Sequence, residues 1–280
     1  MNKTLSLFGM RLTTVARDFE QFPLSETIQK SFFRDLAACA DRWLTEQKCF
    51  DAGAFDTEEW VKHFYLAYLE SPFRQQFGGS RFNNMLWLSL LSRAYNPAVI
   101  IDSGTFMGAS AWALSLGAPS AKVWSFDIDL SQIEKRTPGV HYVEQDWTEF
   151  DFGTDAGTRS LIYFDDHVDQ ARRLLETYER GIGLAIFDDD FPVVPALAMA
   201  NGGRSFPKIE FVLSDELRIE QEIVWSSGRR SWRWPVDTAY LDRARDVIAV
   251  TDRLPNTSSI TGIHQTPYRI VKLKPMHRLA

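Results

Sequence analysis

The 280-residue chain is 45% hydrophobic and 24% charged, a composition typical of globular proteins with one large domain or a domain and an appendage. Its formal net charge of -6 disfavours nucleic acid as a general partner, and no apolar run approaches the ~20 residues that a membrane span needs. The two cysteines, Cys39 and Cys49, disfavour a disulfide framework, and no signal peptide is expected over residues 1–11, so the cytoplasm is the favoured compartment.

Residues 1–97 carry helical patterns and show no alternation of strands and turns. Apolar residues recur at helical spacing over residues 27–50, 60–69 and 81–95, and the acidic run 56–59 is typical of a helix start. We therefore predict a helical N-terminal extension over residues 1–97. Three roles stay open for it: covering the edge of a sheet, forming a dimer surface in a homo-oligomer, or closing over a substrate as a lid.

From residue 98 the pattern changes to alternating strands and helices, which favours a mostly parallel sheet with helices on both faces. We predict an α/β fold over residues 98–280: a Rossmann-like open sheet with a C-terminal antiparallel strand pair. Residues 191–235, with their prolines and glycines, are expected to be irregular. The predicted strands are 98–101, 122–126, 140–143, 161–164, 184–187, 258–264 and 268–273, and the predicted helices begin near 108 and span 169–179 and 238–250.

The turn after the first predicted strand has the pattern D-x-G-x-x-x-G-x-S, from Asp102 to Ser110. Gly104 allows a sharp turn, and Gly108 lets the following helix lie close to the strand. The amides at the helix start face a ligand, and the Asp102 carboxylate suits an amine or a ribose hydroxyl better than a pyrophosphate. A strand-turn-helix with purely structural glycines is the alternative.

An acid follows each of the first five predicted strands. The carboxyl ends of the strands form the ligand-binding edge of an open α/β sheet, so these acids should converge there. Asp127 lies nineteen positions after Gly108, at the end of the second strand, where an acid hydrogen-bonds the two hydroxyls of a ribose. An aspartate that caps a helix would occupy the same position, so both interpretations stay open.

The fourth and fifth predicted strands end in Asp-Asp-His (165–167) and Asp-Asp-Asp (188–190). As neighbours in the sheet, these ends would lie about 5 Å apart, and their carboxylates would repel unless a cation neutralises them or one is protonated. Mg²⁺ held by oxygen ligands would solve this problem and would activate a substrate hydroxyl. Helix capping, or pairing with Arg172, Arg173 or Arg204, is the alternative.

These segments resemble a known group of enzymes. The pattern from Asp102 to Ser110 resembles the first motif of class I S-adenosylmethionine-dependent methyltransferases. Asp166 and His167, after an apolar strand, look like a metal-binding strand end of the catechol O-methyltransferase-like group, and the fifth strand is similar to their second metal strand. The cephalosporin-hydroxylase-like and rhamnosyl O-methyltransferase-like group shares this layout. The resemblance covers residues 98–190 and the closing strand pair, and it leaves out the N-terminal third.

The resemblance implies S-adenosylmethionine as cofactor and Mg²⁺ as metal. Asp146 would contact the adenine amine while its neighbour covers the ring, although an Asp-Trp turn would leave the same pattern. The metal ligands would be Asp166, Asp188 and Asp189, and catalysis would involve Asp166 and His167. The cofactor-binding residues would be Asp102, Ser103, Gly104, Thr105, Gly108, Ser110, Asp127, Ile128, Asp146, Trp147 and Asp165.

One position departs from the group. The catechol enzymes carry a lysine as general base shortly after the Asp-His pair, and here that position falls near Asp169. We therefore predict His167 as the proton acceptor, because a neutral imidazole can serve as a base. A packing or orienting role for His167 is the alternative, and His264 is a more distant candidate.

Residues 226–234 (SSGRRSWRW) interleave arginines and tryptophans. Such a segment binds carboxylate, phosphate or aromatic groups, or it anchors an exposed turn on the protein body. With the acidic net charge, we predict a small acidic or aromatic acceptor whose oxygen is methylated, and no nucleic acid or membrane partner. Two alternatives stay open: another metal-assisted reaction on the same fold, and a non-catalytic S-adenosylmethionine-binding module.

Overall fold

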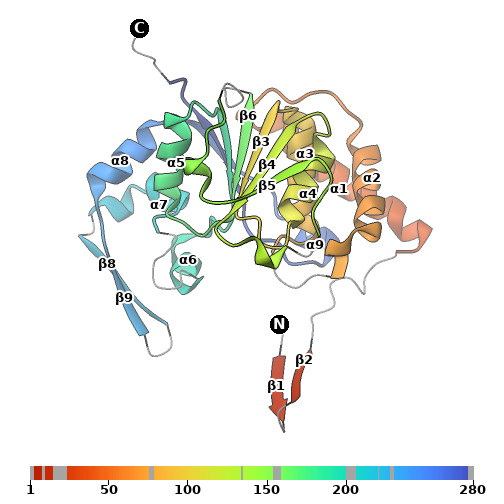
Figure 1. Cartoon of the computed structure of the whole chain (residues 1–280), viewed down its shortest axis with the longest axis horizontal. Helices are drawn as coiled ribbons and strands as arrows, with labels where there is room; N and C mark the ends of the chain where they lie inside the picture. The colour runs from red at the N-terminus through yellow and green to blue at the C-terminus, as the bar shows by residue number, and fades with distance from the viewer. Residues whose placement is uncertain are drawn as a thin grey trace.

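The computed structural model describes residues 3–7, 10–14, 24–75, 79–133, 135–153, 159–199, 206–219, 221–227 and 230–276. Its centre is a seven-stranded sheet with the order β10-β11-β7-β6-β3-β4-β5 (Figure 1). Neighbouring strands from β7 to β5 are parallel, and β11 runs antiparallel to both β7 and β10. The strands are β3 (Val99–Ser103), β4 (Lys122–Asp127), β5 (Val140–Glu144), β6 (Ser160–Phe164), β7 (Leu184–Phe187), β10 (Ile248–Arg253) and β11 (Arg269–Leu273).

Helices cover both faces of the sheet because successive side chains of a strand point to opposite faces. In β3, Ile100 joins the hydrophobic cluster of one face, and Val99 and Ile101 join that of the other. The fold class predicted from the sequence is confirmed. The first face carries α1 (Glu26–Glu46), α2 (Thr57–Glu70), α3 (Phe82–Tyr95) and α4 (Ala109–Gly117), and the second carries α5 (Gln170–Glu179), α7 (Ile209–Leu213) and α8 (Thr238–Asp246).

The N-terminal extension packs on the sheet through α3, which is almost entirely buried. Asn83 Nδ2 donates to the carbonyl oxygen of Ile263 at 2.7 Å, and Asn84 Nδ2 donates to Thr266 Oγ1 at 2.8 Å. These bonds tie the extension to the segment before β11. The extension also contains an antiparallel pair, β1 (Lys3–Leu7) and β2 (Met10–Thr14), which the helical pattern of residues 1–97 did not predict.

Residues 191–235 are more regular than predicted. They contain α6 (Val193–Met199), α7 and an antiparallel hairpin of β8 (Glu222–Ser227) and β9 (Arg230–Pro235). The tryptophans of the Arg/Trp segment alternate with arginines, so one face of β9 packs against an aromatic cluster around Phe206 while Arg233 faces solvent. Gly228 and Arg229 of that segment lie outside the described residues, as does Arg204. The tryptophans therefore anchor the hairpin on the protein body.

The C-terminal antiparallel pair is confirmed, but its first strand was placed wrongly. The predicted helix 238–250 ends at Asp246, and β10 begins at Ile248. The predicted strand 258–264 forms α9 (Ser258–Thr261) and a turn, where Gln265 Oε1 accepts hydrogen bonds from the amide and hydroxyl of Thr257, each at 2.8 Å.

Among the described helices, none has both the length and the apolar character needed to cross a membrane.

Candidate functional site

A cavity of about 430 Å³ opens at the carboxyl ends of β3, β4, β5 and β6. Four aspartates predicted to converge at this edge line it, which follows from the parallel direction of these strands. Its volume falls within the range of small-molecule sites. The lining residues are Gly79, Ser103, Gly104, Phe106, Phe126, Asp127, Ile128, Gln145, Asp146, Asp165, Asp166, His167, Val168 and Arg173.

The turn between β3 and α4 forms one wall. Gly104 has a φ of +101°, and a Cβ atom there would lie 2.5 Å from the carbonyl carbon of Asp165. Only glycine permits this close approach of two strand ends. Gly108, with a φ of +92°, precedes the first residue of α4, and a Cβ atom there would lie 3.3 Å from the carbonyl oxygen of Lys135.

Asp102 lies beneath this wall and does not line the cavity. It is completely buried and accepts a hydrogen bond from Ser125 Oγ at 2.5 Å. Burial raises the pKa of Asp102 to about 7, against the opposing effect of hydrogen bonds from Ser125 and Ser110. Thr105, Ser110 and Gly108 also lie outside the lining, and the Thr105 hydroxyl is hydrogen-bonded to that of Ser125 at 2.6 Å.

Asp127 stands at the end of β4 with both carboxylate oxygens engaged by backbone amides. Oδ2 accepts from Phe106 N at 2.9 Å and Oδ1 from Asp129 N at 3.2 Å. Phe106 has a φ of +44°, uncommon for a residue with a side chain. The neighbouring Ile128 is strongly exposed, so it offers apolar surface at the cavity mouth.

Arg173 of α5 supplies a positively charged side chain to the cavity lining, and this side chain is only 2% exposed. Its guanidinium pairs with Asp146 at 2.6 Å and with Asp166 at 2.7 Å. Burial would raise the pKa of Asp146, but hydrogen bonds from Arg173 and Thr148 lower it to about 2. Trp147 is the residue expected to cover the adenine ring of the cofactor. It is instead buried in the core against Phe164 and does not line the cavity.

Asp166, a predicted metal ligand, therefore has a protein partner. Besides Arg173, it accepts a hydrogen bond from Ser103 Oγ at 2.7 Å. Pairing with an arginine was one alternative to metal binding for the acids at these strand ends, and it describes Asp166.

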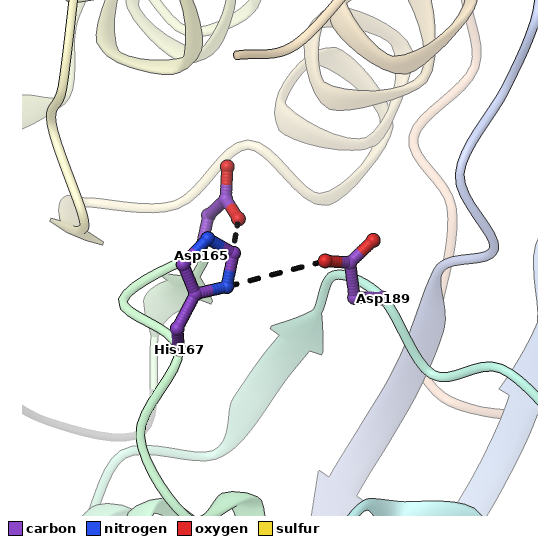
Figure 2. A group of neighbouring side chains, drawn as sticks. All are labelled: Asp165, His167 and Asp189. Carbon is purple, nitrogen blue, oxygen red and sulfur yellow. Dashed lines mark ion pairs between the residues drawn. The ribbon is translucent and has the colours of Figure 1, made fainter. Parts of the chain in front are cut away.

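A different trio of residues lies close enough together to hold a cation. Asp165, His167 and Asp189 point toward one another, and their potential ligand atoms all lie within 4.8 Å (Figure 2). His167 Nδ1 is 4.0 Å from Asp165 Oδ1 and 4.0 Å from Asp189 Oδ2. His167 and Asp189 both have left-handed backbones, with φ of +55° and +56°, and such conformations concentrate at functional sites.

The three aspartates after β7 have three different environments. Asp188 is buried and accepts hydrogen bonds from Tyr163 at 3.1 Å and Thr266 at 2.6 Å. Burial and the neighbouring Asp189 raise the pKa of Asp188 to about 7. Asp190 is paired with Arg269. Of these three acids, Asp189 is the one in the trio.

Several residues of this region were missed or placed elsewhere by sequence reasoning. Phe106 and Gln145 line the cavity and adjoin predicted residues, so their neighbours in the sequence were the available signal. Lys208 lies near the acids but comes from a segment predicted to be irregular, which gave no signal. His264 is exposed and lies outside the cavity lining.

Comparisons with known proteins find solved structures at low similarity. No model of a known protein family matches the chain, and no curated protein sequence matches it. An O-methyltransferase from Bacillus cereus in complex with SAH is 12% identical, with coverage of 86% of this chain and 99% of its own and a TM-score of 0.43.

Two further structures are similar to the same extent. TomG, an O-methyltransferase from Streptomyces achromogenes involved in tomaymycin synthesis and solved with SAM, is 12% identical over 89% of this chain and 99% of its own, with a TM-score of 0.41. The SAH-bound methyltransferase PaMTH1 from Podospora anserina is 15% identical over 90% and 98%, with a TM-score of 0.39. Identities and TM-scores of this size support no conclusion about function. The functional assignment therefore rests on the geometry of the site.

Proposed function

We propose that the chain is an S-adenosylmethionine-dependent methyltransferase that methylates an oxygen of a small molecule. The observation that carries this proposal is the cavity beside Gly104, where acidic strand ends meet. Four of its lining residues are aspartates and one is an arginine, so the cavity favours a cationic ligand over a pyrophosphate. S-adenosylmethionine, with its sulfonium and no phosphate, has this chemistry.

Each lining element has a proposed part in binding. Asp127 is proposed to accept hydrogen bonds from the ribose hydroxyls, since its carboxylate is held at the end of β4 by backbone amides. Phe126 and Ile128 offer apolar surface for the adenine ring. When bound, the cofactor supplies an activated methyl group. The chain's contribution is then to align the acceptor oxygen with it, because an in-line displacement depends chiefly on positioning.

For a metal, the trio Asp165, His167 and Asp189 is the best-supported site. Carboxylate oxygens are the ligands that Mg²⁺ prefers, and two aspartates here each have an oxygen 4.0 Å from His167 Nδ1 (Figure 2). A Mg²⁺ ion would lower the pKa of an acceptor hydroxyl. Without a metal, the 68% exposed His167 side chain is accessible as a proton acceptor; with a metal on its imidazole, the ion would activate the hydroxyl instead.

Cofactor binding is the first test. We expect S-adenosylmethionine and its demethylated product to raise the melting temperature and NAD to leave it unchanged. Asp127→Ala should weaken binding of the demethylated product at least tenfold in calorimetry. Asp129→Ala is the matched control, because Asp129 is exposed and lies outside the cavity lining. If neither nucleoside binds, the function proposed here is wrong; if Asp127→Ala binds normally, only the ribose assignment fails.

Turnover is the second test, and it separates an enzyme from a binding module. With an acceptor found by screening small phenols and hydroxy acids, Mg²⁺ should stimulate methyl transfer and EDTA should suppress it. Asp189→Asn should abolish the stimulation while leaving cofactor affinity within twofold of wild type, because Asp189 does not line the cavity. Stimulation that survives in Asp189→Asn would place the metal elsewhere.

The remaining assignments follow from this function. We propose residues 98–280 as the catalytic part and residues 1–97 as a cover over one face of the sheet, which the buried α3 supports. The two free cysteines and a small-molecule substrate favour the cytoplasm.

A further inference from the structure

Lys208 is a buried lysine that the proposed function does not use. It precedes the first residue of α7 and is only 5% exposed. Gln170 fixes the backbone on either side of it: Gln170 N donates to the carbonyl of Pro207 at 3.0 Å, and Gln170 Oε1 accepts from Ile209 N at 3.0 Å. Gln170 Nε2 also donates to the carbonyl of Asp188 at 2.7 Å. Lys208 is therefore held against the end of β7.

The acids at the ends of β6 and β7 act electrostatically on this lysine. Burial lowers the pKa of Lys208, and the charges of Asp189, Asp188, Asp190 and Asp165 raise it, in that order of effect. Within the described parts of the chain, its ammonium has no hydrogen-bond or ion-pair partner. A buried charge without a direct partner is costly, so the nearby carboxylates have to compensate for it at longer range.

The other acids of this edge already have cations of their own. Arg173 pairs with Asp166, and Arg269 pairs with Asp190. Asp165 and Asp189 make no such contact with an arginine or lysine among the described residues. Lys208, whose pKa is raised most by Asp189 among these acids, is thus the remaining cation of this edge in the described residues. Burial and the neighbouring acids raise the pKa of Asp165 well above its ordinary value.

We propose that Lys208 is the internal counter-cation of Asp165, Asp188 and Asp189 and competes with a divalent cation for this acidic site. The proposal rests on the metal site of the proposed function. A divalent ion between Asp165 and Asp189 would meet the positive charge of Lys208, whereas removing that charge would leave the carboxylates free for the metal. The protein therefore tolerates its acids without metal and binds metal weakly.

Metal affinity is the direct test. Mn²⁺ is titrated calorimetrically into wild type and into Lys208→Met, Lys208→Arg and Lys272→Met. We expect Lys208→Met to bind Mn²⁺ at least tenfold more tightly than wild type. Lys208→Arg keeps the charge and should stay within threefold, as should the exposed control Lys272→Met. Adding Asp189→Asn should abolish the gained affinity. An affinity of Lys208→Met within twofold of wild type, or no Mn²⁺ binding by any variant, would overturn the proposal.

Folding gives a second readout. If Lys208→Met alone loses its folded structure by circular dichroism, the double variant Lys208→Met/Asp189→Asn should regain it, because one negative charge is removed with the positive one. A double variant as unfolded as the single would also overturn the proposal. Binding of the demethylated cofactor, measured on the same samples, should be unchanged because Lys208 does not line the cavity. A wild type that fails to bind it refutes the methyltransferase function and leaves the result on Lys208 standing.

Discussion

Replacing Gly104 with alanine tests whether the close approach of β3 and β6 builds the cavity. At this position a Cβ atom would lie 2.5 Å from the carbonyl carbon and 2.6 Å from the carbonyl oxygen of Asp165. Both contacts are with backbone, so no side-chain rotation relieves them. The ends of the two strands would have to separate, and Asp165 would move away from His167 and Asp189.

The cost has two sources. The left-handed backbone destabilises a residue with a side chain by about 1–2 kcal/mol, and an extra methyl group in a packed region costs about 1–3 kcal/mol. Gly139 provides a matched control, because its φ is +82° and a Cβ atom there would meet nothing within 4 Å. Gly139→Ala should therefore show the first cost alone, and Gly104→Ala should lower the free energy of unfolding by about 2–5 kcal/mol.

Urea denaturation of the two variants measures this difference, and calorimetry with the demethylated cofactor measures its effect on the cavity. We expect Gly104→Ala to bind at least tenfold more weakly than Gly139→Ala. If the two variants lose equal stability and bind equally well, the approach of β3 to Asp165 is not what shapes the cavity.

Two further predictions concern buried charges. Arg173→Met should lower the free energy of unfolding by about 3–5 kcal/mol, because it leaves Asp146 and Asp166 without their buried partner, while the exposed control Arg172→Met should change it by less than about 1 kcal/mol; equal effects in urea denaturation would contradict this. Since burial raises the pKa of Asp102 to about 7, its contribution to stability is present at low pH and is lost as the pH rises through 7. Asp102→Asn should therefore gain about 3 kcal/mol relative to wild type between pH 5 and pH 8, and parallel pH profiles would refute it.

The sequence was sufficient where local pattern decides the structure. The parallel strands are short apolar runs, and the turn at Gly104 needs a residue without a side chain, so periodicity and glycine spacing predicted both. The convergence of acids followed from the shared direction of parallel strands. The apolar runs and the glycine turn are properties of residues close together in the chain, and together with the shared strand direction they place the cavity.

The roles of individual acids were harder to predict, because neighbouring residues at a strand end face opposite ways. Tyr163 faces the cluster around α3, and Phe164 faces the one around α5. Asp165 and Asp166 continue this alternation, so Asp166 meets Arg173 while Asp165 meets His167. Two aspartates that are adjacent in the sequence therefore differ in role: Asp166 is neutralised by an arginine, whereas Asp165 is a candidate metal ligand. Left-handed backbones at His167 and Asp189 then break the alternation, and periodicity does not predict such breaks.

The negative and positive charges of the site come from different elements of the chain. The carboxylates come from the ends of neighbouring strands, whereas the cations come from separate elements: Arg173 from α5, Arg269 from β11 and Lys208 from the start of α7. Each cation neutralises acids from other segments. Removing one cation therefore leaves buried carboxylates without the positive charge that stabilises them. The described segment before α7 contributes no residue to the cavity lining, so we expect the identity of residue 208 to change metal affinity without altering the cavity beside Gly104. We therefore predict that substitutions at residue 208 change metal affinity and leave cofactor binding unchanged.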